Sequence, residues 1–278
     1  KRLPTIMPQL TFEESLELTK IYSIAGLLSS KRPLIKARPF RSPHHTSSSA
    51  ALAGGGRIPG PGEVTLAHRG VLFLDEMPEF ARGSLEVLRQ PLEDKQIQLS
   101  RASGTYVFPA GFILVAAMNP CPCGYYPDMN KCRCTPGEVS HYLHKLSQPL
   151  LERIDLCADV PPVNFSQISG EKSGESSALI RKRVEKARRI QQKRYQNEKI
   201  CFNGELSGKQ IRKYCVLTEN AFQVAKNAFE LMELSARSYH RILKVSRTIA
   251  DMEGEELIHT RHVAEALTYK AFDKKYRS

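Results

Sequence analysis

Two continuous apolar runs dominate the first half of the chain and predict buried strands. Val71–Leu74 is apolar throughout and leads directly into Asp75 and Glu76, while Phe112–Ala117 ends close to Asn119. Such runs are typical of strands that are buried on both faces of a parallel sheet. We therefore expect an α/β layered fold in this part of the chain.

Helical and alternating patterns surround these two runs. Thr11 and Glu14 have the spacing of a capping box, which predicts the start of a helix. An amphipathic helix is expected at about Gly83–Leu92. The segments Gln96–Arg101 and Thr105–Phe108 flank a short turn sequence, which predicts a β-hairpin.

Residues 37–63 predict a long basic loop. Gly54-Gly55-Gly56 and Pro59-Gly60-Pro61-Gly62 are expected to exclude a regular element there. The basic and histidine side chains of this segment are Arg38, Arg41, His44, His45 and Arg57.

The second half of the chain has a helical pattern that follows a polar linker. Ser166–Ser177 is rich in Gly and Ser, which is typical of a linker. A long basic helix is expected at Ala178–Asn197. Residues 1–165 are thus expected to form an α/β core and residues 166–278 an all-helical domain. Four further helices are predicted from the capping residues Ser207, Thr218, Ser235 and Thr260.

Composition narrows the class of protein. Of the 278 residues, 41% are hydrophobic and 25% charged, which argues against bulk disorder and fibrous structure. The longest apolar run, Phe112–Met118, is far shorter than the roughly 20 residues of a membrane-spanning helix. No signal-peptide pattern opens the sequence, so we expect a cytoplasmic protein without a membrane partner. The net charge of +12 suits a polyanionic partner or an inert basic surface.

The polar residues after the two apolar runs suggest phosphate chemistry. Ligands of open α/β sheets bind at the carboxyl ends of the strands. In nucleoside-triphosphate hydrolases, an acid such as Asp75 holds hydrated Mg²⁺ and a neighbour such as Glu76 polarises the attacking water. Asn119, at the end of the next strand, could orient the same water. The alternative is a strand that ends in two solvated acids, with Asn119 capping a turn.

Four of the seven cysteines occur as two closely spaced pairs. Four thiolates can surround one tetrahedral Zn²⁺, although structural zinc sites more often use pairs separated by two residues. His141 and His144 lie close enough to substitute as ligands. The alternatives are free thiols in a flexible loop or a disulfide pair. The candidate zinc ligands are Cys121, Cys123, Cys132 and Cys134.

Combined motifs resemble a known family. Residues 62–80, 108–124, 149–156 and 235–254 resemble the magnesium-chelatase-like family of AAA+ ATPases, and most closely its ComM/YifB branch. The resemblance covers nearly the whole chain. It implies an α/β AAA+ core followed by an all-α lid domain, with ATP and Mg²⁺ as cofactors.

The resemblance also implies roles for single residues. Asp75 and Glu76 match the Walker B acids, and Asn119 matches the sensor 1 residue. Arg153 matches the arginine finger, which reaches the nucleotide site of a neighbouring subunit. Without the family, Arg153 would be interpreted as a helix-surface arginine paired with Glu152 or Asp155.

The lid is expected to contribute a phosphate contact of its own. Arg237 matches sensor 2, and Arg241 is a second candidate one turn later. For both residues the alternative is a solvated helix face.

A DNA partner is implied by two insertions of the family. The basic Gly/Pro loop resembles the helix-2 insert, and the hairpin resembles the pre-sensor-1 hairpin; both face the channel of the ring. Such loops would bind DNA without recognising its sequence. The basic helix Ala178–Asn197 is a second candidate, with a solvated face as its alternative. The expected DNA contacts are Arg38, Arg41, Arg57 and Arg101.

One departure from the family concerns the phosphate-binding loop. No GxxxxGK[ST] motif is present; Gly204–Lys209 comes near, but Gln210 replaces the Ser or Thr. The sequence is therefore expected to be a fragment that starts just after the Walker A motif and that does not itself hydrolyse ATP.

The complete protein is expected to be a hexameric, Mg²⁺-dependent ATPase that acts on DNA as a helicase or branch-migration motor. Two alternatives remain. One is a magnesium-chelatase motor subunit that drives metal insertion into a porphyrin. The other is a non-catalytic module that binds zinc and nucleic acid.

Overall fold

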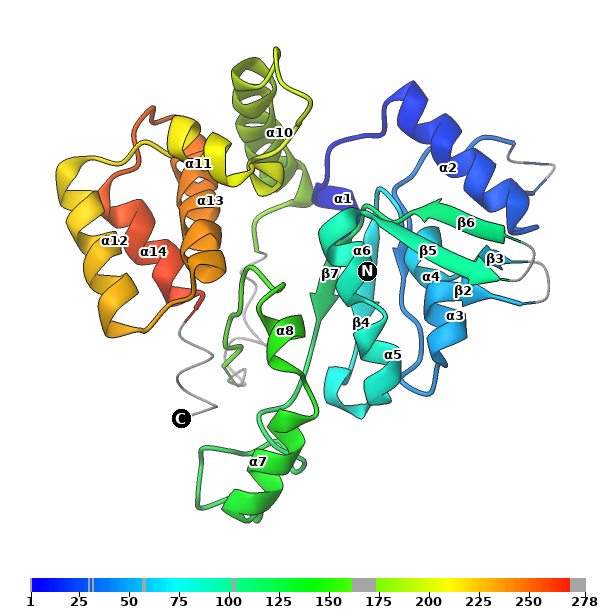
Figure 1. Ribbon diagram of the computed structural model, residues 1–278, viewed down its shortest axis with the longest axis horizontal. Helices are drawn as coiled ribbons and strands as arrows, with labels where there is room; N and C mark the ends of the chain where they lie inside the picture. Colours follow the sequence, from blue (N-terminus) through cyan, green and yellow to red (C-terminus); the bar gives the residue numbers. More distant parts are fainter. Residues whose placement is uncertain are drawn as a thin grey trace. The chain divides into compact units, whose positions relative to one another are not determined.

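The computed structural model describes residues 2–29, 31, 33–56, 59–101, 104–161 and 174–270. The chain divides into two compact units, Lys1–Ile154 (unit 1) and Asp155–Ser278 (unit 2) (Figure 1). This division precedes the predicted linker at Ser166–Ser177, most of which lies outside the described residues. Within the described residues, every helix is too short or too polar to span a bilayer.

Unit 1 combines a parallel sheet, two antiparallel ribbons and several short helices (Figure 1). Its elements are α1 (Leu3–Ile6), α2 (Phe12–Ile24), β1 (Phe40–Arg41), α3 (Ser49–Ala53), β2 (Gly54–Gly55), β3 (Gly60–Pro61), α4 (Glu63–Leu66), β4 (Val71–Leu74), η1 (Met77–Glu79), α5 (Arg82–Glu86), α6 (Arg89–Asp94), β5 (Gln96–Arg101), β6 (Gly104–Pro109), β7 (Ile113–Ala116), α7 (Pro136–His144) and α8 (Gln148–Leu151).

The three-stranded sheet has the order β1-β4-β7, and both pairings are parallel. Val71 of β4 is opposite Phe40 on one side and Ile113 on the other. The two predicted strands are thus confirmed as neighbours in a parallel sheet. The expected burial holds largely for β4 but was wrong for β7, whose four residues are partly buried or exposed at the edge of the sheet. β7 forms one edge, where Ile113 is 50% exposed. No strand of the described residues pairs with the outer side of β7.

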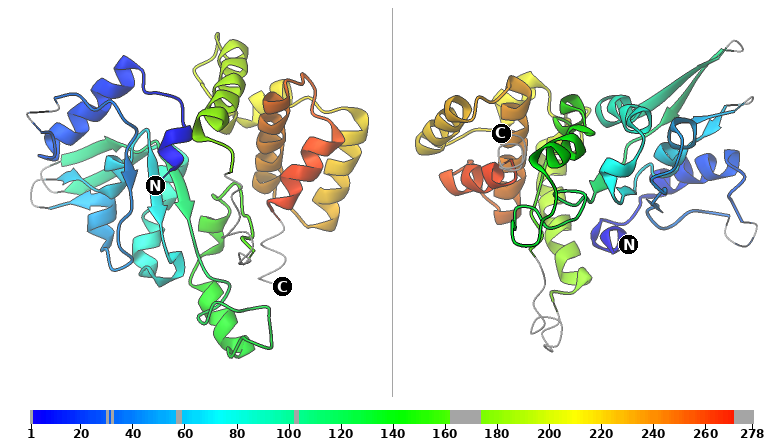
Figure 2. Two further views of the ribbon diagram at one scale, coloured as in Figure 1. Left: turned by 180° about the vertical axis from the view of Figure 1, so that it is seen from behind. Right: turned by 90° about the horizontal axis from the view of Figure 1, so that it is seen from below.

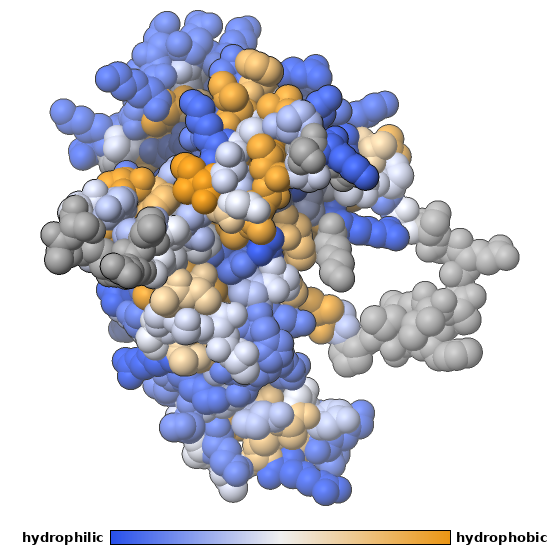
Figure 3. All heavy atoms as spheres, turned by 90° about the vertical axis from the view of Figure 1, so that its right-hand side faces the viewer, coloured by the Kyte–Doolittle hydropathy of each residue, from blue (hydrophilic) through white to orange (hydrophobic). Residues whose placement is uncertain are grey.

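The core of unit 1 lies where the sheet meets the helices. Leu72 and Leu74 of β4, Leu85 of α5 and Leu150 of α8 are all fully or almost fully buried in one cluster. Apolar side chains also reach the surface of the molecule (Figure 3). In unit 1, Phe12 at the start of α2 is 69% exposed. The packing of this cluster holds β4 in place, and β4 in turn positions Asp75 and Glu76, which follow it directly.

The segment expected to be an irregular loop, residues 37–63, contains several short regular elements. It contains β1, α3 and an antiparallel ribbon in which Gly54 is opposite Pro61. A Cβ atom on Gly54 would lie 2.4 Å from the carbonyl oxygen of Gly60 and 2.9 Å from the nitrogen of Gly62. The expectation that these glycines exclude a regular element was wrong, because they permit the two backbones to approach this closely.

The β-hairpin is confirmed, and the helix before it is interrupted. β5 and β6 pair from Gln96 opposite Pro109 to Arg101 opposite Gly104, and the ribbon extends away from the rest of unit 1 (right panel of Figure 2). The helix expected at Gly83–Leu92 is divided into α5 and α6. Pro91 explains the break, because its ring clashes with the carbonyl group four residues earlier in a continuous helix.

In the described residues of unit 2 every regular element is a helix, apart from one isolated bridge, and this confirms the predicted helical region. Ser207, Thr218 and Ser235 cap helices as predicted. The fourth cap is His259 rather than Thr260, which is the first residue of its helix. The elements are α10 (Ser177–Arg194), η2 (Asn203–Glu205), α11 (Gly208–Tyr214), α12 (Glu219–Leu231), α13 (Ala236–Glu253) and α14 (Thr260–Thr268).

A buried group of charges joins α10, η2 and α13. Arg247 and Asp251 are both fully buried on α13, and the Arg247 Nε lies 3.1 Å from Asp251 Oδ1. Arg194 donates a second hydrogen bond of 2.8 Å to Asp251, as does the side-chain amide of Asn203. Burial lowers the pKa of Arg247, and the Asp251 charge opposes this shift. Asp251 is therefore the only carboxylate at the centre of this group in the described part of the chain.

Replacing Asp251 with Asn is expected to lower the free energy of unfolding of unit 2 by about 3–5 kcal/mol, because the Arg247 guanidinium stays buried without a counter-charge. The control is Arg183→Gln, which breaks an exposed ion pair with Glu175 and should cost about 0–1 kcal/mol. Urea unfolding followed by circular dichroism measures both. Equal losses in the two variants would contradict the buried-charge argument.

Candidate functional site

Three polar residues follow the carboxyl ends of two adjacent parallel strands. Leu74 of β4 is opposite Ala116 of β7, so Asp75 and Glu76 leave the sheet beside the segment that leads to Asn119. The turn after β4 is fixed by the Met77 N–H group, which donates a 3.0 Å hydrogen bond to the Ala117 carbonyl. All three polar residues are exposed at this edge.

Asp75 and Glu76 lie in a tight turn directly after β4. Glu76 has a left-handed backbone conformation with φ of 50°, which is uncommon for a residue other than glycine. Its N–H group donates a 3.1 Å hydrogen bond to Asp75 Oδ1. An exposed carboxylate such as Asp75 suits a hydrated Mg²⁺, which takes one or two carboxylates together with phosphate and water oxygens.

His45 and Tyr142 also belong to this site, although neither was predicted to. His45 Nδ1 lies 3.4 Å from Glu76 Oε2, and its ring packs beside that of His44. Burial raises the pKa of Tyr142, as do the nearby charges of Glu79 and Glu76, while a hydrogen bond from the Asn119 backbone lowers it. The Tyr142 hydroxyl group therefore lies close to both strand ends.

Arg153 lies just after α8 and is mostly buried, with its side chain 11% exposed. Its guanidinium donates one hydrogen bond of 2.6 Å to the Pro149 carbonyl and another to the carboxylate of Glu93. The ion pair therefore reaches to α6, and the partners considered from the sequence, Glu152 and Asp155, are not the ones that the structure gives.

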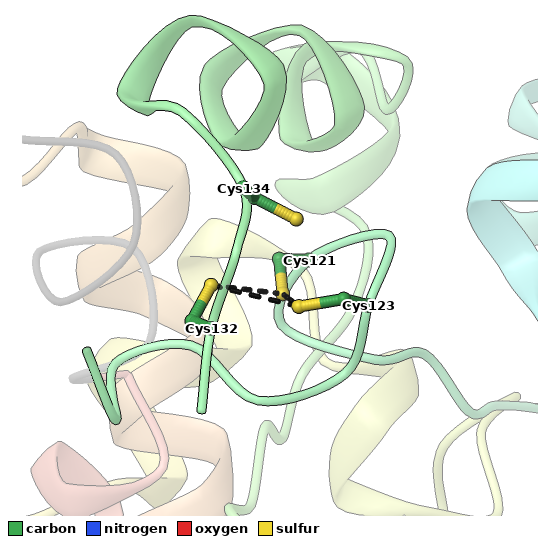
Figure 4. A group of neighbouring side chains, drawn as sticks. All are labelled: Cys121, Cys123, Cys132 and Cys134. Carbon is green, nitrogen blue, oxygen red and sulfur yellow. Dashed lines mark hydrogen bonds between the residues drawn. The ribbon is translucent and has the colours of Figure 1, made fainter. Parts of the chain in front are cut away.

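The four paired cysteines come together in the loop between β7 and α7. Figure 4 shows their sulfur atoms directed toward one another, and all lie within 4.8 Å of each other. The Sγ–Sγ distances are 3.4 Å for Cys121–Cys123, 3.8 Å for Cys121–Cys132 and 3.6 Å for Cys123–Cys132. A tetrahedral ion with Zn–S bonds of about 2.3 Å requires sulfurs about 3.8 Å apart, whereas a disulfide requires about 2.05 Å.

Backbone N–H groups surround these sulfurs. The Tyr126 N–H donates to Cys121 Sγ at 3.4 Å. N–H groups of Tyr125 and Arg133 lower the pKa of Cys123 to about 6. The four sulfurs fit a metal-thiolate centre without His141 or His144, which are outside the group. All seven cysteines of the chain are free thiols.

Comparison with known proteins identifies the family. Residues 1–168 match the family described as "Magnesium chelatase, subunit ChlI", and residues 174–270 match its C-terminal part. The chain belongs to the magnesium-chelatase-like AAA+ family. It is 44% identical to the uncharacterized protein YifB of Salmonella typhimurium over 98% of the chain and 53% of YifB. It is 46% identical to competence protein ComM of Haemophilus influenzae over 97% of the chain and 52% of ComM.

The matched relatives are longer than this chain. The chain spans about half the length of the curated relatives that it matches. Membership of the AAA+ family suggests an ATPase that uses ATP and Mg²⁺.

The lid arginines of the AAA+ pattern both lie on α13 in unit 2. Arg237 is exposed near the start of the helix. Arg241, one turn later, is mostly buried and forms an ion pair of 3.4 Å with Asp155. Their assignment to a nucleotide phosphate stays a prediction.

Two of the four expected DNA contacts are held inside unit 1. Arg38 is 6% exposed and bonds Glu14 and the carbonyl oxygens of Pro8, Gln9 and Arg69. Because these hydrogen bonds occupy the guanidinium N–H groups, they are not available to a phosphate. We therefore do not include Arg38 among the proposed DNA contacts.

Arg41 is held in a similar way. It forms a two-pronged ion pair with Glu63, with both N–O distances 2.6 Å, and this carboxylate raises its pKa. We leave Arg41 out of the proposed contacts for the same reason. Arg57 and the side chain of Arg101 lie outside the described residues.

Proposed function

We propose that this chain carries the Walker B, sensor and lid parts of a Mg²⁺-dependent ATPase that forms a ring and remodels DNA. The observation that carries the proposal is the position of Asp75, Glu76 and Asn119 at the ends of adjacent parallel strands. Asp75 would hold the hydrated metal ion, Glu76 would accept a proton from the attacking water, and Asn119 would orient that water.

The open edge of β7 supports a sheet that is larger in the complete protein. An apolar strand with Ile113 half exposed is unusual for a parallel sheet, whose strands are normally covered. We propose that a strand leading into a P-loop pairs with this edge in the complete protein. The 278-residue chain has no P-loop motif, and we expect it to bind nucleotide weakly and not to hydrolyse it.

The action on DNA rests on charge and on the hairpin. The net charge of +12 favours a polyanionic partner, and the β5–β6 ribbon extends from unit 1 where a ring channel could receive it. One of the relatives is named a competence protein. We propose a cytoplasmic hexamer that works as a helicase or branch-migration motor, in which Arg153 reaches the site of the neighbouring subunit.

The experiment compares Glu76→Gln with Glu79→Gln in the full-length protein. Glu79 is also exposed near the site but pairs with Lys145. We expect Glu76→Gln to lower the rate of ATP hydrolysis by about 10²–10⁴-fold with nucleotide binding retained, since it removes the proton acceptor. Glu79→Gln should stay within about threefold of the parent.

DNA dependence distinguishes the proposed activity from the chelatase alternative. We expect duplex or branched DNA to increase the hydrolysis rate of the full-length protein. Stimulation by a porphyrin-chelatase partner subunit, with no effect of DNA, would overturn the DNA part of the proposal and favour metal insertion. Equal rates for the two glutamine variants would overturn the assignment of Glu76.

A further inference from the structure

Helix α10 of unit 2 has one buried side and one strongly cationic side. Ala187 and Gln191 are buried, and α10 packs along α13 on this side (Figure 1). At about 100° per residue, the residues that point the opposite way fall within a sector of about 60°. These residues are Lys182, Lys186, Arg189 and Lys193, all of them exposed. We call them the α10 stripe.

The α10 stripe is poorly neutralised. Among the described residues, no carboxylate lies within ion-pair distance of Lys182, Lys186 or Lys193. Glu185 lies beside the stripe and approaches Arg189 at 3.9 Å, a long distance for an ion pair. The Lys186 ammonium extends toward the end of α13 near Gly254. The stripe therefore presents close to four positive charges to solvent.

This arrangement does not serve the stability of the helix. Like charges spaced three or four residues apart destabilise a helix by about 0.2–0.5 kcal/mol per pair. The stripe contains three consecutive pairs of this kind. The buried side holds α10 in place through Arg194 and Asp251, and the Lys186 ammonium near the C-terminal end of α13 offsets only part of the repulsion on the opposite side.

The length of the stripe matches a polyanion. From Lys182 to Lys193 the helix rises about 16 Å. Duplex DNA carries one charge per about 1.7 Å of its axis with both strands counted, so a duplex segment of this length carries about ten phosphate charges, more than the four cations of the stripe. Lysine and arginine side chains bind such a backbone without recognising bases.

We propose that the α10 stripe binds the phosphate backbone of DNA. The choice of DNA rests on the proposed function, but binding by the stripe requires neither ATP hydrolysis nor ring formation. It is a contact in the helical unit, separate from the hairpin and the Gly/Pro loop of unit 1. Counterion release from the phosphates supplies the affinity, so binding depends steeply on salt.

The test uses the 278-residue chain, a fluorescein-labelled 30-base-pair duplex, and anisotropy at a series of salt concentrations. The stripe variant is K182Q/K186Q/R189Q/K193Q. The matched control is K20Q/K36Q/K209Q/K226Q, whose lysines are exposed and scattered over both units. Each variant replaces four cations, so the net charge falls from +12 to +8 in both. Circular dichroism confirms that both fold.

We expect the stripe variant to bind at least about tenfold more weakly at low salt and to lose about 3–4 from the slope of log K against log salt. The control should lose less than about 1 from that slope. The variant K182R/K186R/K193R should bind like the parent, because the charges are kept.

Other outcomes overturn the proposal in distinguishable ways. If the parent chain binds DNA and the stripe variant binds equally well, the stripe assignment fails and the proposed function stands. Equal losses in stripe variant and control would show that only net charge matters. A parent chain that binds no DNA would overturn the stripe and count against the proposed function. Competition by polyglutamate as strong as by DNA would indicate an acidic protein as the partner.

Discussion

In the full-length protein, Arg153→Ala is expected to lower the rate of ATP hydrolysis by about 10³–10⁵-fold, while Glu93→Gln should leave it within about threefold. The range is that of arginine fingers, which neutralise charge on the transferred phosphoryl group. The two residues form an ion pair within unit 1. The variants therefore remove opposite halves of one contact.

The comparison separates the two roles that Arg153 can have. If its role is only to pair with Glu93, both substitutions break the same ion pair and have similar effects on stability and rate. If it reaches a neighbouring site, the guanidinium must leave Glu93 on assembly, and only Arg153→Ala removes the contact with phosphate. Similar rates for the two variants would contradict the finger assignment.

Mixed rings provide the control for a shared site. Glu76→Gln subunits lack the proposed proton acceptor and keep Arg153, and Arg153→Ala subunits have the reverse defect. Each variant alone should be inactive, but a mixture contains interfaces in which an intact Glu76 faces an intact Arg153. We expect the mixture to regain a measurable fraction of the parent rate. No recovery in rings that are shown to be mixed would contradict a site shared between subunits.

Local patterns predicted the elements that place the site. The apolar runs before Asp75 and Asn119 identified two strands that pair in parallel, because continuous apolar runs are typical of strands in parallel sheets. The cysteine spacing predicted the cluster because its four members lie within one segment of 14 residues. Alternation around the turn predicted the hairpin.

The sequence did not predict which distant residues these arginine side chains would pair with. Arg38 was expected to contact DNA, but its partners are a carboxylate and carbonyl oxygens up to 31 residues away. Arg153 pairs with Glu93, 60 residues earlier, rather than with either neighbouring acid. Charge and spacing predict that an arginine needs a partner; only the fold selects which carboxylate is near.

The cysteine centre has the second of the two largest expected effects. The chain, purified without chelator, is expected to contain about one zinc ion, and Cys132→Ser should lose at least about nine-tenths of it, since structural zinc requires four ligands. Cys132 is 9% exposed and lies within 3.8 Å of Cys121 and Cys123. Cys201→Ser is the control, because Cys201 is exposed and outside the cluster.

Loss of the metal is expected to disorder the loop, because little else holds it. Two of its large apolar side chains are exposed, Tyr125 at 55% and Met129 at 68%, and Tyr126 is only partly buried. Structural zinc contributes binding free energy on the order of 10 kcal/mol in small sites, which is then lost from folding. Faster proteolysis and faster amide exchange between Cys121 and Cys134 measure this disorder.

The disorder should reach the proposed nucleotide site through Asn119. A Cβ atom on Gly124 of the cysteine loop would lie 3.8 Å from the Asn119 side chain, so loop and sensor residue are in close proximity. We therefore expect Cys132→Ser, in the full-length protein, to lower the hydrolysis rate by about 10²-fold, the loss that a misplacement of about 1 Å in an active site can cause. Zinc analysis by mass spectrometry and the absorption spectrum of the Co²⁺-substituted chain identify a tetrahedral thiolate site. Full zinc content in Cys132→Ser would contradict a four-cysteine centre, and so would an equal loss of zinc in Cys201→Ser. A visible iron–sulfur absorption would show that the centre holds a different metal.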